Sequence, residues 1–226
     1  MGLTAILFDF DGCILDTMKR HGLLAANVMN KYFGMPVETA IKRYHETTGI
    51  PFPKQLENIF PNKPDKWKPC ADEYVRRKTE EVFNKAVPFP DVKEMLKALK
   101  KKGVLLVISS STEADMINRI MEKFGLDSYV KHVYGEHEGG KPDHVKDIEE
   151  KYNPETVVFV GDSTSDVKMN QKAERVITVG RAGPESSGML SKEKLIEAGA
   201  NIATDDLRVL AKIMDFSEYR GKNVIL

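Results

Sequence analysis

The chain has 226 residues, of which 41% are hydrophobic and 30% charged, as in a globular protein with a hydrophobic core. Lys and Arg together number 34, as do Asp and Glu, so the formal net charge is zero, which argues against a protein that coats nucleic acid or a membrane surface. Two cysteines, Cys13 and Cys70, are too few for a disulfide framework or a zinc cluster, and no apolar run approaches the ~18 residues of a membrane span. We therefore expect a cytoplasmic protein with neither nucleic acid nor a membrane as partner.

Short apolar runs rich in β-branched and aromatic residues predict strands over residues 4–10, 104–109, 129–134, 156–160 and 175–179. These runs are continuously apolar, which is typical of strands that are buried on both faces of a parallel sheet. Amphipathic stretches between and after them predict helices over 91–101, 113–124, 143–152, 165–171 and 192–198. The alternation predicts an α/β fold, a doubly wound, Rossmann-like parallel sheet with right-handed crossovers.

One long segment interrupts this alternation. Residues 17–87 contain six of the eleven prolines, and their apolar residues follow helical spacing. We therefore expect an α/β core domain made of residues 1–16 and 88–226, with a small helical cap domain inserted at 17–87. The insertion follows the first strand, at the sheet edge where open α/β sheets bind ligands. Residues 217–226 form a tail that the sequence pattern does not assign.

The insert also differs from the rest of the chain in charge. It carries 13 Lys and Arg against 8 Asp and Glu, a surplus of five positive charges. A basic cap over an acidic core suits an anionic substrate beside a metal site. Ordinary variation among solvated helix faces explains the surplus equally well.

The first strand closes on Phe8-Asp9-Phe10-Asp11-Gly12. Because side chains alternate along a strand, Asp9 and Asp11 are expected on the same side, about 7 Å apart. Two carboxylates this close repel each other unless a cation lies between them, and a hard cation such as Mg²⁺ is the natural partner. An acidic turn closed by Gly12 is the purely structural alternative.

A second acidic pair follows the strand at 156–160, in the run Gly161-Asp162-Ser163-Thr164-Ser165-Asp166. Ser163 as a helix cap and Asp166 in the first helical turn form a sufficient local explanation for those two residues. It leaves Asp162 unexplained. Two further carboxylates at the same sheet edge would complete a metal shell.

Two other strand ends carry polar groups. Ser109, Ser110, Ser111 and Thr112 lead from a strand into a helix, and hydroxyls and free amides at a helix N-terminus bind phosphate oxygens, although one of them could serve only as a cap. After the next strand, Gly139-Gly140-Lys141-Pro142 projects a lysine from a loop at the same edge.

The order of acid pair, hydroxyl, lysine and acid pair, from Leu3 to about Ile213, resembles the haloacid dehalogenase-like hydrolase superfamily. The similarity is to its Mg²⁺-dependent helical-cap phosphatases, the group that includes phosphoglycolate phosphatases and β-phosphoglucomutases. It implies that Asp9 attacks phosphorus to form an aspartyl-phosphate. Asp11 would protonate the leaving oxygen and then activate the water that hydrolyses this intermediate.

The same resemblance implies the ligands of the metal and of the phosphate. Mg²⁺ would be held by Asp9, the Asp11 backbone carbonyl, Asp162 and Asp166, the last directly or through water. The equatorial phosphoryl oxygens would be stabilised by Lys141, the Ser109 hydroxyl and the backbone amides of Gly12 and Ser110. The implied function is hydrolysis of a small phosphorylated metabolite.

In the insert, Thr48 and Gly49 resemble the cap loop that enters the active site of relatives, and Arg43 and His45 just precede it. All four are candidate substrate contacts, with structural roles equally open for Arg43 and His45. His21, at the start of the insert, is expected to pack rather than to act in catalysis.

Several alternatives stay open. Asp11 argues against a dehalogenase or a phosphonate hydrolase, but a hexose-phosphate mutase of the same family keeps both acids. A receiver-type signalling module also combines acids, a hydroxyl and a lysine, but has no helical insert. Cys70 and Arg76 match the Cys-x5-Arg spacing of cysteine phosphatases without the glycines that such a loop uses. The identity of the substrate and the oligomeric state do not follow from the sequence.

Overall fold

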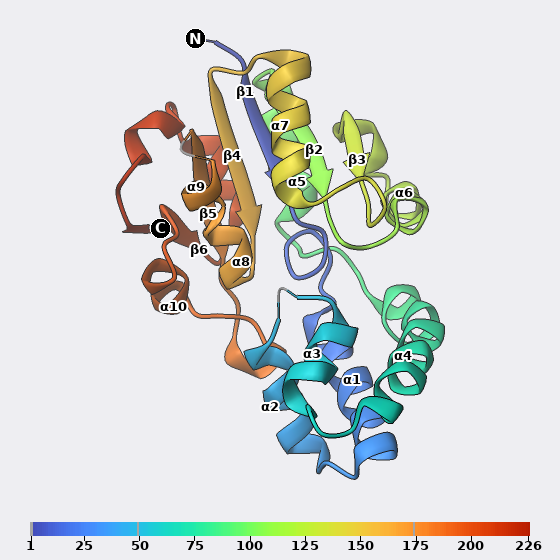
Figure 1. The fold of residues 1–226 in the computed structure, drawn as a ribbon. Coiled ribbons are helices and arrows are strands. Elements are labelled where there is room, and N and C mark those ends of the chain that lie inside the picture. Colours follow the sequence, from blue (N-terminus) through green and yellow to red (C-terminus); the bar gives the residue numbers. More distant parts are fainter. Residues whose placement is uncertain (1, 49, 174) are drawn as a thin grey trace.

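The computed structural model describes residues 2–48, 50–173 and 175–226. Its centre is a parallel sheet in the order β3-β2-β1-β4-β5-β6-β7, which confirms the predicted α/β fold (Figure 1). The strands are β1 (Thr4–Phe8), β2 (Leu105–Ser109), β3 (His132–Tyr134), β4 (Thr156–Gly161), β5 (Val176–Arg181), β6 (Ile202–Thr204) and β7 (Val224–Ile225). The last two were not predicted, because neither lies in a longer run of β-branched and aromatic residues, as the short β3 does; β7 lies in the unassigned tail.

Helices cover both faces of the sheet (Figure 1). On one face, α5 (Val92–Lys101) and α6 (Ala114–Lys123) pack over a core that includes Ile6 and Phe8. On the other, α7 (Lys141–Tyr152) and α9 (Met169–Lys172) enclose a second core around Leu7 and Phe159. Two further helices, α8 (Thr164–Val167) and α10 (Lys192–Glu197), complete the arrangement near β5. Side chains of neighbouring residues in β1 thus pack into the cores on opposite faces of the sheet, as strand alternation requires.

Between β1 and α5 the described residues form four α-helices, α1 (Met18–Phe33), α2 (Val37–Glu46), α3 (Phe52–Ile59) and α4 (Trp67–Glu81). We call these four helices the helical module. They share a hydrophobic cluster of their own, which includes Leu24, Met29 and Leu56. The module lies beyond the carboxyl ends of the central strands (Figure 1).

The two segments that connect the module to the sheet run side by side. Asp16 N donates to the Val87 carbonyl at 3.0 Å, and Phe89 N donates to the Ile14 carbonyl at 3.1 Å. A bridge between Leu15 and Pro88 lies between these bonds. The pairing brings the start and the end of the module to one point of the sheet edge.

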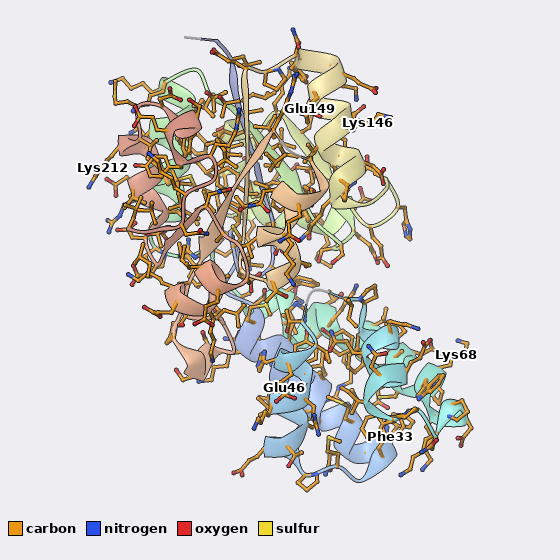
Figure 2. All side chains as sticks on the ribbon, turned by 60° about the vertical axis from the view of Figure 1, so that its left-hand side comes forward. Phe33, Glu46, Lys68, Lys146, Glu149 and Lys212 are labelled. Carbon is orange, nitrogen blue, oxygen red and sulfur yellow. The ribbon has the colours of Figure 1, made fainter. Side chains whose placement is uncertain are left out.

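Some of the positively charged side chains of the module pair with acidic residues on its outer surface. Lys68, at the periphery of the module in Figure 2, pairs with Asp72 at 2.6 Å. Lys31 and Arg77 both pair with Glu73, and Lys54 pairs with Glu57. These contacts favour the interpretation of the charge surplus as solvated helix faces.

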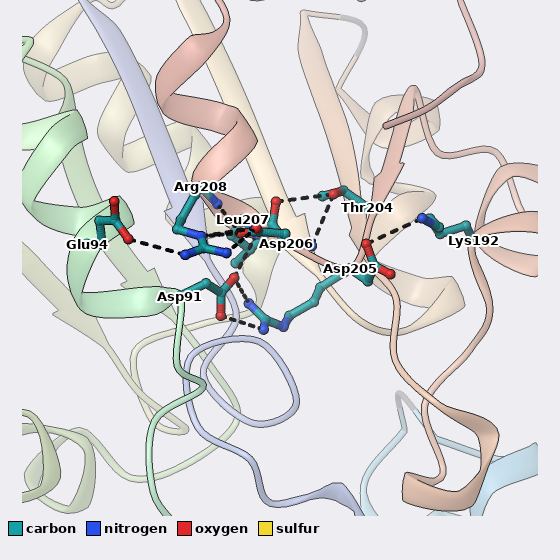
Figure 3. A network of polar contacts seen from close by, with 9 residues as sticks. Asp91, Glu94, Lys192, Thr204, Asp205, Asp206, Leu207 and Arg208 are labelled. Carbon is teal, nitrogen blue, oxygen red and sulfur yellow. Dashed lines mark hydrogen bonds and ion pairs between the residues drawn. The ribbon is translucent and has the colours of Figure 1, made fainter.

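The return from the module to the sheet is held by a buried ion pair. Arg181, at the end of β5, donates to both carboxylate oxygens of Asp91, at 2.8 and 3.0 Å. The Leu207 amide donates to the same carboxylate at 2.7 Å, and Arg208 nearby pairs with Asp206 and Glu94 (Figure 3). Asp91 and Arg181 are 6% and 3% exposed. One cation therefore meets one anion, with further hydrogen bonds to the carboxylate.

Candidate active site

The polar groups that follow β1 and β4 meet because these two strands are neighbours. Phe8 is in register with Val160, and the Asp9 amide donates to the Val160 carbonyl at 2.8 Å. Asp9 therefore leaves β1 beside the point where Asp162 leaves β4. Gly12, with a φ of +71°, turns the chain here, and a Cβ on it would lie 2.3 Å from an Asp162 carboxylate oxygen. The turn thus requires glycine for its backbone conformation and for space.

Three carboxylates converge at this edge. Asp9, Asp162 and Asp166 are buried, and one carboxylate oxygen of each lies within 4.8 Å of the other two. Lys141 Nζ pairs with Asp9 at 2.9 Å and with Asp166 at 2.6 Å. The lysine was predicted on a loop, but it is the first residue of α7. Four residues from the predicted site are therefore brought into one cluster.

Burial governs the ionisation of this cluster. It raises the pKa of Asp9 to about 7, against the opposing charge of Lys141, and it raises the pKa of Asp162 well above its ordinary value. Burial lowers the pKa of Lys141, but Asp166 and Asp9 outweigh burial, so its net pKa is raised. Three carboxylates thus share one ammonium. Their oxygens, their spacing and their surplus of negative charge fit a divalent cation.

Asp166 combines a structural and an electrostatic contact. Its backbone amide donates to Ser163 Oγ at 3.3 Å, and its Oδ2 accepts from the Ser163 backbone amide at 3.2 Å, which makes a capping box at the start of α8. The Ser163 hydroxyl also donates to this Oδ2, at 2.6 Å. The other carboxylate oxygen of Asp166 faces Lys141. Helix capping therefore holds the carboxylate in place while leaving one oxygen in the cluster.

Asp11 is held apart from the cluster by hydrogen bonds from three residues, two at the start of α1 and one after β2. Thr17 Oγ1 donates to it at 2.8 Å, Thr112 Oγ1 donates at 2.6 Å, and His21 Nε2 lies 3.3 Å from its Oδ1. Burial raises the pKa of Asp11, but the hydrogen bonds from His21, Thr112 and Thr17 outweigh it, and the net pKa is lowered.

Sequence reasoning did not assign these three residues to the site. Thr112 was only one member of a run of hydroxyls, and His21 was expected simply to pack. The available signal was the spacing of Thr17 and His21, which are one helical turn apart and therefore face the same side.

The structure gives three of the expected phosphate-binding groups partners within the protein. The amides of Gly12 and Ser110 donate to the carbonyls of Leu15, at 2.9 Å, and Tyr134, at 3.1 Å, because the first closes the turn and the second continues the β2–β3 pairing. The Ser109 hydroxyl is fully buried and lies 2.8 Å from His144 Nδ1. Of the expected phosphate-binding groups, Lys141 is the one whose described contacts place it directly against Asp9.

The candidate substrate contacts in the module differ in their positions. Arg43 is paired with Glu46 on the exposed side of α2, and the Thr48 hydroxyl donates to the Tyr44 carbonyl. His45 packs against the backbones of Gly22 and Gly188, where an added Cβ would meet its ring at 2.5 and 1.9 Å. It thus joins α2 to the segment after β5. Gly49 lies outside the described residues.

The cysteine phosphatase alternative is not supported. Cys70 and Arg76 both lie within α4, so the residues between them form a helix instead of a phosphate-binding loop. Burial also raises the pKa of the Cys70 thiol to about 12, which disfavours the nucleophilic thiolate.

Comparisons with known proteins place the chain among hydrolases. A family model described as haloacid dehalogenase-like hydrolase matches residues 6–179. The chain is 30% identical over 176 residues to a provisionally named pyrophosphatase, PpaX, of Caldanaerobacter subterraneus, covering 74% of this chain and 76% of that protein. It is 25% identical over 191 residues to a phosphoglycolate phosphatase of Aquifex aeolicus, covering 76% and 81% of the two chains.

Solved structures share the fold. A protein named as a predicted phosphatase from Clostridium acetobutylicum superposes with a TM-score of 0.75 at 23% identity, over 93% of this chain and 97% of that one. Within the described residues, no helix is long and apolar enough to cross a membrane.

The family match extends over both the sheet and the helical module, and it includes the Asp9, Lys141 and Asp162 segments. The chain therefore belongs to the haloacid dehalogenase-like hydrolase family and is a phosphatase-type enzyme of that family.

Proposed function

We propose that the protein is a Mg²⁺-dependent phosphatase that hydrolyses a phosphate monoester of a small metabolite through an aspartyl-phosphate. The observation that carries the proposal is the buried cluster in which Lys141 faces both Asp9 and Asp166 beside Asp162. The carboxylates of Asp9, Asp162 and Asp166, with the Asp11 backbone carbonyl, would hold Mg²⁺. When bound, the ion would offset the negative charge of the nucleophile and of the phosphoryl group.

In the first step, an Asp9 carboxylate oxygen attacks phosphorus, and the bond between phosphorus and the ester oxygen breaks. Asp11, in its protonated form, gives its proton to the leaving oxygen, so an alcohol departs. Lys141 stabilises charge on the equatorial phosphoryl oxygens from its position against Asp9. The product of this step is a phosphorylated Asp9.

In the second step, water attacks the phosphorus of the aspartyl-phosphate and gives a proton to Asp11. The phosphorus–carboxylate bond breaks, inorganic phosphate leaves, and Asp9 is regenerated. The contacts from Thr17, His21 and Thr112 orient Asp11 and favour its ionised form, which accepts the proton in this step. The protonated form that the first step uses is therefore the less populated one.

We further propose that residues 17–87 act as a cap domain over a core of residues 1–16 and 88–226. The paired connections at Leu15 and Pro88 provide a single hinge. Asp9 is only 8% exposed, and His21 of the module contacts Asp11, so the module covers the site. Desolvation under a cap strengthens the electrostatic contacts of the reaction.

The test is phosphate release over a panel of metabolite phosphates, with phosphoglycolate and pyrophosphate included because relatives bear those names. We expect turnover with Mg²⁺, and a loss of at least about a thousandfold in Asp9→Asn, because the amide is not a nucleophile. Asp115→Asn, on the exposed side of α6, is the matched control and should keep full activity.

Turnover that persists in Asp9→Asn would remove Asp9 from the role of nucleophile. Interconversion of a sugar phosphate, without release of phosphate, would instead identify the mutase alternative.

A further inference from the structure

A chain of buried polar contacts leads from α4 of the helical module to Asp11. The Tyr74 hydroxyl lies 2.6 Å from His21 Nδ1, and His21 Nε2 lies 3.3 Å from Asp11 Oδ1. Tyr74 and His21 are each 7% exposed. The imidazole is therefore held at both of its nitrogens, by a phenol on one side and a carboxylate on the other.

The chemistry of the three groups fixes the direction of both hydrogen bonds. An ionised Asp11 only accepts, so His21 Nε2 must carry the proton that lies between them. Burial raises the pKa of Tyr74 well above its ordinary value, so its phenol keeps its proton. The His21 tautomer that carries its proton at Nε2 can accept the hydrogen bond of the phenol at Nδ1, which satisfies both ring nitrogens at once.

Apolar packing places these rings independently of their hydrogen bonds. The Phe52 ring stands 4.3 Å from the Tyr74 ring between centroids, and the Phe83 ring meets His21 edge-on at 5.6 Å. Removal of the Tyr74 hydroxyl with retention of its ring should therefore preserve the module. The hydroxyl is available for a second purpose, which is to fix the rotation of the imidazole.

We propose that Tyr74 is a positioning residue whose hydroxyl fixes the His21 ring so that Nε2 faces Asp11. The inference rests on the proposed function, because Asp11 transfers the proton in that reaction. Tyr74 acts through His21 and has no contact with the reacting atoms in this role. Since Tyr74 lies on α4 and His21 on α1, the packing of two cap helices determines the orientation of a group in the core.

The experiment compares Tyr74→Phe with Tyr32→Phe. Tyr32 is the matched control, because its hydroxyl donates to Glu73, between the same two helices, at 2.9 Å and away from Asp11. We expect kcat to fall about tenfold in Tyr74→Phe, with KM within about twofold and an unchanged melting temperature. Tyr32→Phe should retain the wild-type kcat.

A double-mutant cycle identifies the route of the effect. In a His21→Phe background, Tyr74→Phe should cause no further loss of kcat, because its partner is already absent. Additive losses, an equal loss in Tyr32→Phe, or wild-type kcat in Tyr74→Phe would each overturn the proposal.

A second measurement is independent of turnover. Proton NMR should show a slowly exchanging hydroxyl proton between Tyr74 and His21 in the wild type and in Tyr32→Phe, but not in Tyr74→Phe. Its absence from the wild type would overturn the contact itself. If the signal is present but no phosphate ester is hydrolysed, the proposed function fails while the contact stands, and the positioning role fails with the function on which it rests.

Discussion

Two groups of buried charges lie near the carboxyl ends of the strands, and they differ in their balance. Asp91 and Arg181 form a one-to-one pair in which the carboxylate accepts three hydrogen bonds (Figure 3). Asp9, Asp162 and Asp166 instead share the single ammonium of Lys141. The first group is balanced in charge within the protein. The second is stable only with protons or a cation, which is the property expected of a metal-binding catalytic site.

The largest expected effect comes from removing one charge of the unbalanced cluster. Asp162→Asn should reduce phosphate release by at least about a thousandfold, which corresponds to about 4 kcal/mol of activation free energy. It should also abolish the rise in melting temperature that Mg²⁺ causes, without lowering the melting temperature of the metal-free protein. Activity assays and thermal unfolding with and without Mg²⁺ check both points. A marked loss of metal-free stability would show that the cluster is balanced in the fold.

Breaking the balanced pair should lower the stability of the protein and leave its activity unchanged. Arg181→Met leaves Asp91 buried without its cation, so we expect the free energy of unfolding to fall by about 3 kcal/mol. Below the melting temperature, kcat should be unchanged. Arg208→Met is the control, because its ion pairs with Asp206 and Glu94 are exposed, and its denaturation midpoint should stay at the wild-type value. Urea unfolding measures both variants, and equal losses would argue against a special role for the buried pair.

The smallest expected effect is a pH dependence of stability that arises from the unbalanced cluster. The pKa of Asp9 is about 7 in the folded protein and 3.8 when unperturbed, so the folded state holds this proton more tightly. Stability from that proton is fully present below about pH 4 and is lost as the pH rises through 7. We expect the metal-free protein to lose about 2 kcal/mol between pH 5 and 8, and Mg²⁺ to offset the loss. A stability that rises over this range without metal would contradict the assignment.

The sheet and the polar residues that follow its strands could be predicted, because both depend on local sequence patterns. Continuously apolar runs identify buried parallel strands, and residues that follow such strands must meet at one edge. Asp9, Lys141, Asp162 and Asp166 could therefore be grouped before their distances were known. The two short strands β6 and β7 could not, since neither lies in a longer run of β-branched and aromatic residues such as the one at 129–134 that contains β3.

The partners of each polar group depended on tertiary structure. Sequence alone shows that Ser109 and Ser110 end a strand, but only the fold places His144 beside one hydroxyl and the Tyr134 carbonyl beside the other residue's amide. His21 contacts Asp11 because α1 begins next to the turn after β1 and because α4 supplies Tyr74 behind the ring.

What the amino-acid sequence determined by itself was which residues end the strands and how many charges they carry, since apolar periodicity and composition are properties of the chain. What only the tertiary structure decided was which charges balance each other. Hydrogen bonds and ion pairs require contact within a few ångströms, and residues 90 positions apart, such as Asp91 and Arg181, meet only when the sheet and its connections have formed.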